Sequence, residues 1–253
     1  MAENDGYNFA NWGTVASNVE ENIDIPPRTG DIKKIMIQEK LQQLGVSLSD
    51  ITLGNFDQIG EHTAKKARGG NSDLYKSVGC FFRPNYERGI LIYNLIKKYE
   101  VESFLELGFG RGYGTICAAM AMEEMGKGRI TTIDPNLNEN FTNHLRQIFP
   151  TDWFSRIDFI KSTSQGYLST LDHEKSFDFV YIDGDHTYDA VKFDWENTKD
   201  RFNKLLLFDD YHLPSKKDSG PGIQCSNLID QIDDESKELI IMDRRIFFDE
   251  IVY

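Results

Sequence analysis

Two apolar runs in the second half of the chain each end in acidic residues. The run 177–182 leads into the tetrad Asp-Gly-Asp-His at 183–186, and the run 204–208 leads into the pair Asp209-Asp210. Carboxylates brought together repel one another by about 1 kcal/mol per pair even in water, and more strongly when they are buried. A divalent cation would offset this repulsion, and oxygen ligands favour Mg²⁺, Ca²⁺ or Mn²⁺ over Zn²⁺. The residues therefore indicate a cation site; the alternative is that each acid only caps a helix or a loop.

A glycine-rich turn follows an earlier apolar run. Residues 104–114 read Phe-Leu-Glu-Leu-Gly-Phe-Gly-Arg-Gly-Tyr-Gly, and the run 130–134 ends in Asp134. A unit of this kind binds nucleoside ligands, because the glycines admit the ligand to the backbone and the acid accepts hydrogen bonds from ribose hydroxyls. The spacing departs from the dinucleotide fingerprint at Tyr113, and Glu106 would repel a pyrophosphate. The turn thus suits a ligand with hydroxyls or a positive charge, unless it only joins a strand to a helix.

These residues require a scaffold that gathers the ends of strands. The alternation of apolar and amphipathic segments predicts a doubly wound α/β fold with a mostly parallel sheet of seven strands. Strands are expected at 103–107, 129–133, 156–161, 177–182 and 204–208, and helices at 85–99, 112–125, 138–148, 164–170, 187–202 and 223–233. The last two runs, 237–242 and 246–253, are too close for a crossover connection and predict a closing antiparallel hairpin. Ligands of open α/β sheets bind at the carboxyl ends of the strands, which is where the acids and the glycine turn fall.

The N-terminal third of the chain has a weaker pattern. We expect residues 1–84 to form a helical cap or arm outside the sheet, with an amphipathic helix over 31–44, and residues 85–253 to form the ligand-binding domain. Such a cap would either shape an acceptor pocket or mediate oligomerisation, and the sequence does not separate the two.

Composition and charge narrow the class of function. The chain has 253 residues, 40% of them hydrophobic, which is typical of a globular protein. Its net charge of −13 disfavours nucleic acid and anionic membranes as partners. The three cysteines show no metal-ligand spacing and no disulfide framework, and no apolar run reaches the about 20 residues of a membrane span. A soluble, cytoplasmic protein is expected.

The motif Glu106-Leu-Gly-Phe-Gly-Arg-Gly112 resembles the first motif of class I S-adenosylmethionine (SAM) methyltransferases, whose fold is Rossmann-like. Asp134 matches the ribose-binding acid of that family, and the parallel sheet closed by a hairpin resembles its fold. The resemblance implies SAM as cofactor. The cofactor-binding residues that it implies are Glu106, Gly108, Gly110, Tyr113, Asp134, Ser164, Gln165 and Asp183, with Thr163-Ser164-Gln165 as the segment that contacts adenine.

The acids resemble those of the metal-dependent small-molecule O-methyltransferases, which include catechol-type enzymes and the macrocin and aminocoumarin sugar O-methyltransferases. The resemblance implies that Asp183, Asp209 and Asp210 hold the metal. The base of the sugar branch corresponds to Asp185, whereas the catechol branch has a Lys where this chain has His186, so both residues are candidates.

The expected function is therefore transfer of a methyl group from SAM to a hydroxyl of a small molecule, such as a sugar or another vicinal diol, with help from Mg²⁺, Mn²⁺ or Ca²⁺. The partner is the small-molecule acceptor, and the family analogy adds a homo-oligomer. The alternatives are a metal-free N- or carboxyl-methyltransferase and a SAM-binding protein without turnover.

Overall fold

A computed structural model of the chain describes residue 29 and the ranges 32–46, 86–211 and 224–242. Most of the expected N-terminal cap and the second run of the expected hairpin, 246–253, lie outside the described residues.

The main sheet has five parallel strands in the order β4-β3-β2-β5-β6. They are β2 (Ser103–Leu107), β3 (Arg129–Ile133), β4 (Ile157–Ile160), β5 (Phe177–Ile182) and β6 (Phe202–Phe208). Each coincides with an expected strand to within two residues. Helices cover both faces, which is why apolar side chains predominate on both faces of the central strands. The doubly wound α/β architecture is confirmed.

The register of the sheet places the last residues of all five strands in one row. Leu107 of β2 pairs with Ile133 of β3 and with Ile182 of β5. The row continues to Ile160 of β4 on one side and to Phe208 of β6 on the other. The residue that follows each strand is therefore delivered to the same edge of the sheet, which brings the glycine turn and the acids together.

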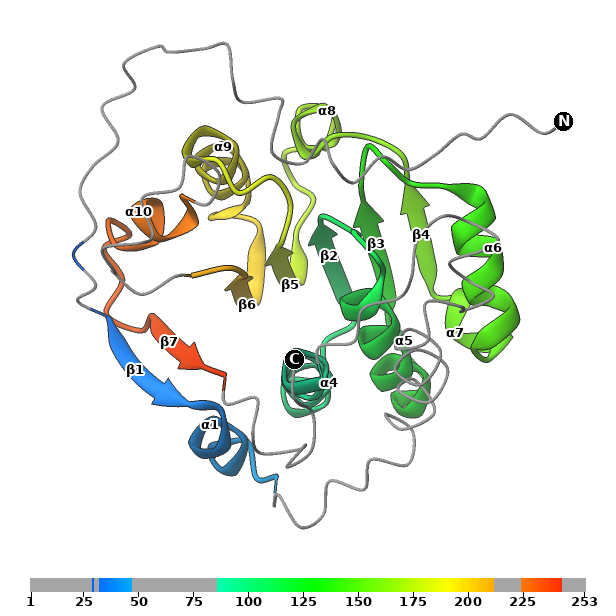
Figure 1. The fold of residues 1–253 in the computed structure, drawn as a ribbon, viewed down its shortest axis with the longest axis horizontal. Coiled ribbons are helices and arrows are strands. Elements are labelled where there is room, and N and C mark those ends of the chain that lie inside the picture. Colours follow the sequence, from blue (N-terminus) through cyan, green and yellow to red (C-terminus); the bar gives the residue numbers. More distant parts are fainter. Residues whose placement is uncertain (1–28, 30–31, 47–85, 212–223, 243–253) are drawn as a thin grey trace, which may run out of the picture.

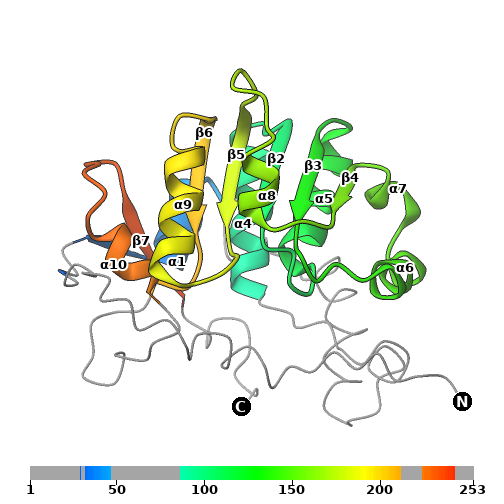
Figure 2. The ribbon, with the colours of Figure 1, turned by 90° about the horizontal axis from the view of Figure 1, so that it is seen from above.

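Alternate strand residues pack on opposite helical layers. Helices α4 (Tyr86–Lys98) and α5 (Tyr113–Met125) cover one face, and α8 (Ser164–Leu168) and α9 (Tyr188–Thr198) cover the other (Figures 1 and 2). Phe104 packs in the core with α4 and α5, whereas its neighbour Leu105 packs with Leu168 of α8.

Three further helices of the described residues complete the domain: α6 (Glu139–Ile148), α7 (Thr151–Phe154) and α10 (Cys225–Ile229). Asn138 caps α6, because its side-chain oxygen accepts from the N–H groups of Asn140 and Phe141. None of the described helices is long and apolar enough to cross a membrane.

The segment before α4 differs from the expectation of one helix over 31–44. Residues Lys33–Met36 form strand β1, and only Ile37–Gln43 form a helix, α1. Strand β1 pairs in parallel with β7 (Glu238–Ile241) as a separate sheet. Ile35 is buried in this sheet, and ion pairs from Lys33 and Lys40 to Glu238 hold β7 to the N-terminal segment. Pairing across about 200 positions thus overrides the local helical pattern.

The antiparallel hairpin and the sheet of seven strands are not confirmed. Strand β7 is the first run of the expected hairpin, and its partner among the described residues is β1 in parallel orientation. The described strands form one sheet of five and one of two.

Candidate active site

The glycine turn after β2 is held in conformations that favour glycine. Gly108, Gly110 and Gly112 have φ values of +103°, +52° and +76°. A Cβ on Gly108 would lie 2.0 Å from the carbonyl oxygen of Asp183, so only glycine lets the ends of β2 and β5 approach this closely. A Cβ on Gly110 would meet nothing within 4 Å. The turn therefore packs tightly at Gly108 and presents open backbone at Gly110.

Asp134, directly after β3, fixes this turn. Its Oδ2 accepts from the Gly110 N–H at 2.9 Å, and its Oδ1 accepts from the Asn136 N–H at 2.7 Å. Burial raises the pKa of Asp134, and these two N–H groups oppose the rise. The carboxylate thus stands beside the open backbone at Gly110, and its contact with a ribose stays a prediction.

Glu106 and Tyr113 lie beneath the turn. The Glu106 carboxylate is 1% exposed and accepts from the hydroxyls of Thr115 and, at 2.6 Å, Thr132. Burial raises its pKa to about 7, although the two threonines oppose the rise. Tyr113 is also buried, and its ring lies against Gly89 of α4. The contacts expected between these side chains and a cofactor stay predictions.

Asp183, which follows β5, and Asp209, which follows β6, both form ion pairs with the guanidinium of Arg88. One terminal nitrogen of Arg88 lies 2.8 Å from Asp183 Oδ2, forms an ion pair with Asp209 and donates to the Tyr181 hydroxyl at 3.0 Å. Tyr181 also donates to Asp183, at 3.1 Å. Burial and the neighbouring Asp209 raise the pKa of Asp183 well above its ordinary value, and Arg88 opposes this rise.

Arg88 was not among the residues singled out from the sequence. It lies 95 positions before Asp183, and its only local signal is a basic residue near the start of a largely apolar helix.

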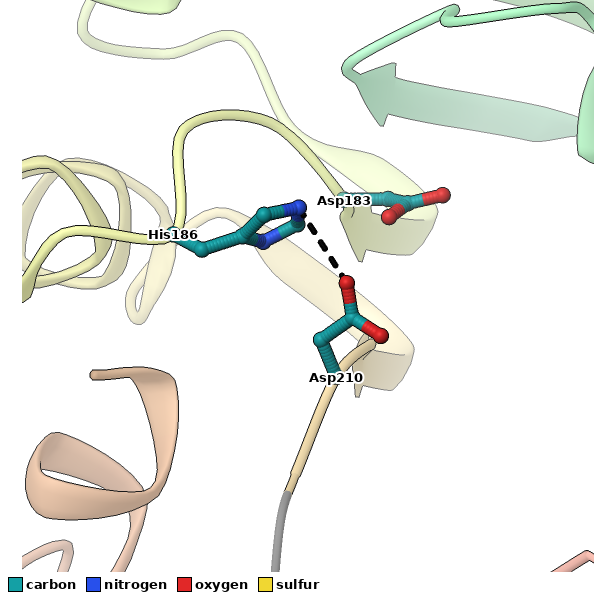
Figure 3. Close-up of side chains that lie close together, drawn as sticks. All are labelled: Asp183, His186 and Asp210. Carbon is teal, nitrogen blue, oxygen red and sulfur yellow. Dashed lines mark ion pairs between the residues drawn. The ribbon is translucent and has the colours of Figure 1, made fainter. Parts of the chain in front are cut away.

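Asp210 pairs with His186, whereas the two acids described above pair with Arg88. The Nε2 of His186 lies 3.2 Å from Asp210 Oδ2 (Figure 3). Its Nδ1 lies 3.7 Å from the sulfur of Cys225 in α10. Asp210 has φ +53°, a value that few non-glycine residues adopt. Burial raises the pKa of Cys225 to about 12, so this neighbour is a neutral thiol. Helix α10 also anchors the loop, because the Gln224 N–H donates to the His186 carbonyl at 2.7 Å.

The expected metal ligands are thus divided. Asp183, His186 and Asp210 each bring a ligand atom to within 4.8 Å of the others, a set that could hold a cation, and Asp209 is not part of it. Asp185, the other candidate base, is exposed, and its Oδ1 accepts from the Thr187 N–H at 2.9 Å.

The expected adenine segment begins α8. The Thr163 side chain caps this helix by accepting from the Gly166 N–H, Ser164 is half-buried and Gln165 is exposed. All three residues follow β4, at the same edge of the sheet as the glycine turn.

Behind the loop after β5 lies Asp194 of α9, which the sequence reasoning also missed. It is 0% exposed, and neither oxygen has a well-formed hydrogen bond to the residues that the structure describes. Burial raises its pKa to about 6, an effect that the nearby Ser164 opposes. Its signal is the spacing of Val191, Asp194 and Thr198, which places a charge on the buried stripe of the helix.

Residues 105–211 match the family of methyltransferase domains, a stretch that runs from β2 to just beyond the acids after β6. No curated protein matches the sequence.

Several solved structures resemble part of this chain. One is the O-methyltransferase TomG of Streptomyces achromogenes, involved in tomaymycin synthesis and solved with SAM, at 18% identity and TM-score 0.42 over 58% of this chain and 60% of that chain. Another is an O-methyltransferase of Bacillus cereus solved with S-adenosylhomocysteine (SAH), at 17% identity and TM-score 0.44 over 62% and 66%. A third is the SAH-bound methyltransferase PaMTH1 of Podospora anserina, at 17% identity and TM-score 0.45 over 60% and 62%. The chain spans less than two thirds of the length of each.

Proposed function

We propose that this chain is a SAM-dependent O-methyltransferase that acts on a hydroxyl of a small molecule. The observation that carries the proposal is the common row of strand ends, which sets the open backbone at Gly110 and the carboxylate of Asp134 beside the acids after β5 and β6. The match of residues 105–211 to methyltransferase domains supports it.

Different residues of the site would bind different parts of SAM. Asp134 would accept from the ribose hydroxyls, the backbone at Gly110 would admit the methionine part, and Ser164 with Gln165 would contact the adenine. Methyl transfer from a sulfonium is an in-line displacement that needs no covalent help from the protein. The main task of the chain is therefore to align the methyl group with the acceptor oxygen.

The acceptor hydroxyl must lose a proton, and two side chains are candidates for taking it. His186 lies beside Asp183 and Asp210, whereas Asp185 is exposed and already accepts from Thr187. Replacement of the residue that acts as base should lower the rate by about 10²- to 10⁴-fold. Comparing His186→Asn with Asp185→Asn in the same assay assigns the role.

A divalent cation, Mg²⁺ before Mn²⁺ or Ca²⁺, is the second part of the proposal. The carboxylate oxygens of Asp183 and Asp210 fit such an ion in type, and the ligand atoms of Asp183, His186 and Asp210 lie within 4.8 Å of one another. The imidazole nitrogen of His186 suits softer ions better, and binding a cation there would leave Asp185 as the base. When bound, the cation would polarise an acceptor hydroxyl and favour its ionised form. Two neighbouring acceptor oxygens would suit this arrangement, which is why a sugar or another vicinal diol is the proposed acceptor class.

The test is to incubate the purified chain with SAM and a panel of sugars, catechols, carboxylates and amines, and to measure SAH by mass spectrometry. We expect SAH to form with diols and to fall when a chelator is added. SAH formation only with carboxylates or amines, insensitive to chelator, would instead identify the metal-free alternative. Absence of heat on mixing the chain with SAH in a calorimeter would refute the proposal as a whole, because product binding does not depend on the acceptor.

A further inference from the structure

Arg88 occupies the place where a counter-charge to the acids is needed. Its side chain reaches from α4 to the carboxyl edge of the sheet, where one nitrogen contacts Asp183, Asp209 and the Tyr181 hydroxyl. About a quarter of each charged side chain is exposed, at 24% for Arg88, 22% for Asp183 and 24% for Asp209. Charges this far removed from water interact more strongly than surface pairs do.

The guanidinium separates the acids into two groups. Asp183 and Asp209 face Arg88, whereas Asp210 pairs with His186. Asp183 belongs to both groups, since its ligand atom also lies within 4.8 Å of those of His186 and Asp210. A divalent cation bound by these three residues would therefore stand next to a positive charge that holds the same carboxylate, and the two would repel.

We propose that Arg88 is a resident counter-ion that competes with a divalent cation for Asp183 and keeps Asp209 out of the cation site. This inference rests on the proposed function, because it concerns the same edge of the sheet. It follows that the native chain binds a cation weakly through Asp183, His186 and Asp210. Loss of the charge at position 88 would release Asp209 and create a tighter site with three carboxylates.

The test measures Mn²⁺ binding directly, by electron paramagnetic resonance of the free ion. In Arg88→Gln, which keeps a hydrogen-bond donor but no charge, the affinity for Mn²⁺ should rise by about tenfold or more. Arg88→Lys keeps the charge and should stay within about threefold of the native chain. The matched control is Arg129→Gln. Arg129 begins β3, at the end of the strand away from the acids, and forms an exposed ion pair with Asp158 of β4, so its loss should leave the Mn²⁺ affinity unchanged. An Arg88→Gln variant that binds Mn²⁺ no better than the native chain would overturn the inference.

A second pair of variants keeps the inference testable if Arg88→Gln does not fold. In the native background, Asp209→Asn should leave Mn²⁺ affinity within about threefold, because Arg88 holds this acid, whereas Asp210→Asn should weaken it by about tenfold or more. Equal losses in both variants would mean that Asp209 already binds the cation and that Arg88 does not compete. SAH binding is measured by calorimetry on the same samples, so that a failure of the proposed function is seen separately from the Mn²⁺ results.

Discussion

The buried carboxylate of Asp194 makes the stability of the protein depend on pH in a calculable way. Burial raises its pKa from 3.8 to about 6, and the side chain is 0% exposed. A change of this size corresponds to about 3 kcal/mol between the charged and the neutral form. The folded chain therefore binds this proton more tightly than the unfolded chain does.

The sign of the effect follows from that difference. Below pH 3.8 the carboxyl is neutral in both states, and Asp194 imposes no penalty. As the pH rises through about 6, the folded state must accept a buried charge without a well-formed hydrogen bond to the described residues, and stability is lost. The asparagine variant Asp194→Asn is neutral throughout. It should therefore match the native chain near pH 4 and exceed it by up to about 3 kcal/mol at pH 8.

The assay is urea unfolding followed by circular dichroism at one-unit steps from pH 4 to pH 8. The relevant quantity is the difference in unfolding free energy between variant and native chain, because other buried acids, such as Glu106, contribute equally to both. Glu196→Gln on the same helix is the matched control, because Glu196 is exposed in a surface ion pair with Lys192. Its unfolding free energy should stay within about 0.5 kcal/mol of that of the native chain at every pH. A difference for Asp194→Asn that is flat with pH, or that falls as pH rises, would refute the reasoning, since it would show that the charged carboxylate is stabilised.

Three further predictions concern the glycine turn and the groups around it. Gly108→Ala should destabilise the fold by about 3 kcal/mol or more, because its Cβ would collide with backbone 2.0 Å away. Gly110→Ala should cost only about 1 kcal/mol of stability and should mainly weaken SAH binding. Urea unfolding and calorimetry with SAH on both variants separate the two effects. Asp134→Asn should weaken SAH binding by about 10- to 100-fold, as for loss of a charged hydrogen bond, and an unchanged dissociation constant would exclude a ribose contact. Glu106→Gln should remove a loss of stability that the native chain shows as pH rises through about 7, and an unaltered pH profile would argue against a buried ionised carboxylate.

Much of the site follows from local pattern. Apolar runs end at Leu107, Ile133, Ile182 and Phe208, and the residues that begin each loop are glycine or aspartate. Parallel strands joined by helices leave the sheet at one edge, so the order of the runs already implies that Asp134 and Asp183 lie near the glycine turn. These features are readable from the sequence because each depends on a short segment and on a topology with few alternatives.

The partners of the charged groups depend on contacts across the chain. Arg88 meets an acid 121 positions later, and Glu238 receives lysines about 200 positions earlier. His186 is set between Asp210 and Cys225 by α10, and Asp194 is buried because α8 and α9 pack together. No short-range period predicts such pairs, since a charged side chain follows whichever opposite charge the folded elements bring within reach. The amino-acid order thus specifies which carboxylates reach the edge of the sheet. Folding in three dimensions settles that an arginine pairs with two of them and that a histidine pairs with a third. It also encloses Asp194 of helix α9 without a well-formed hydrogen bond to the described residues.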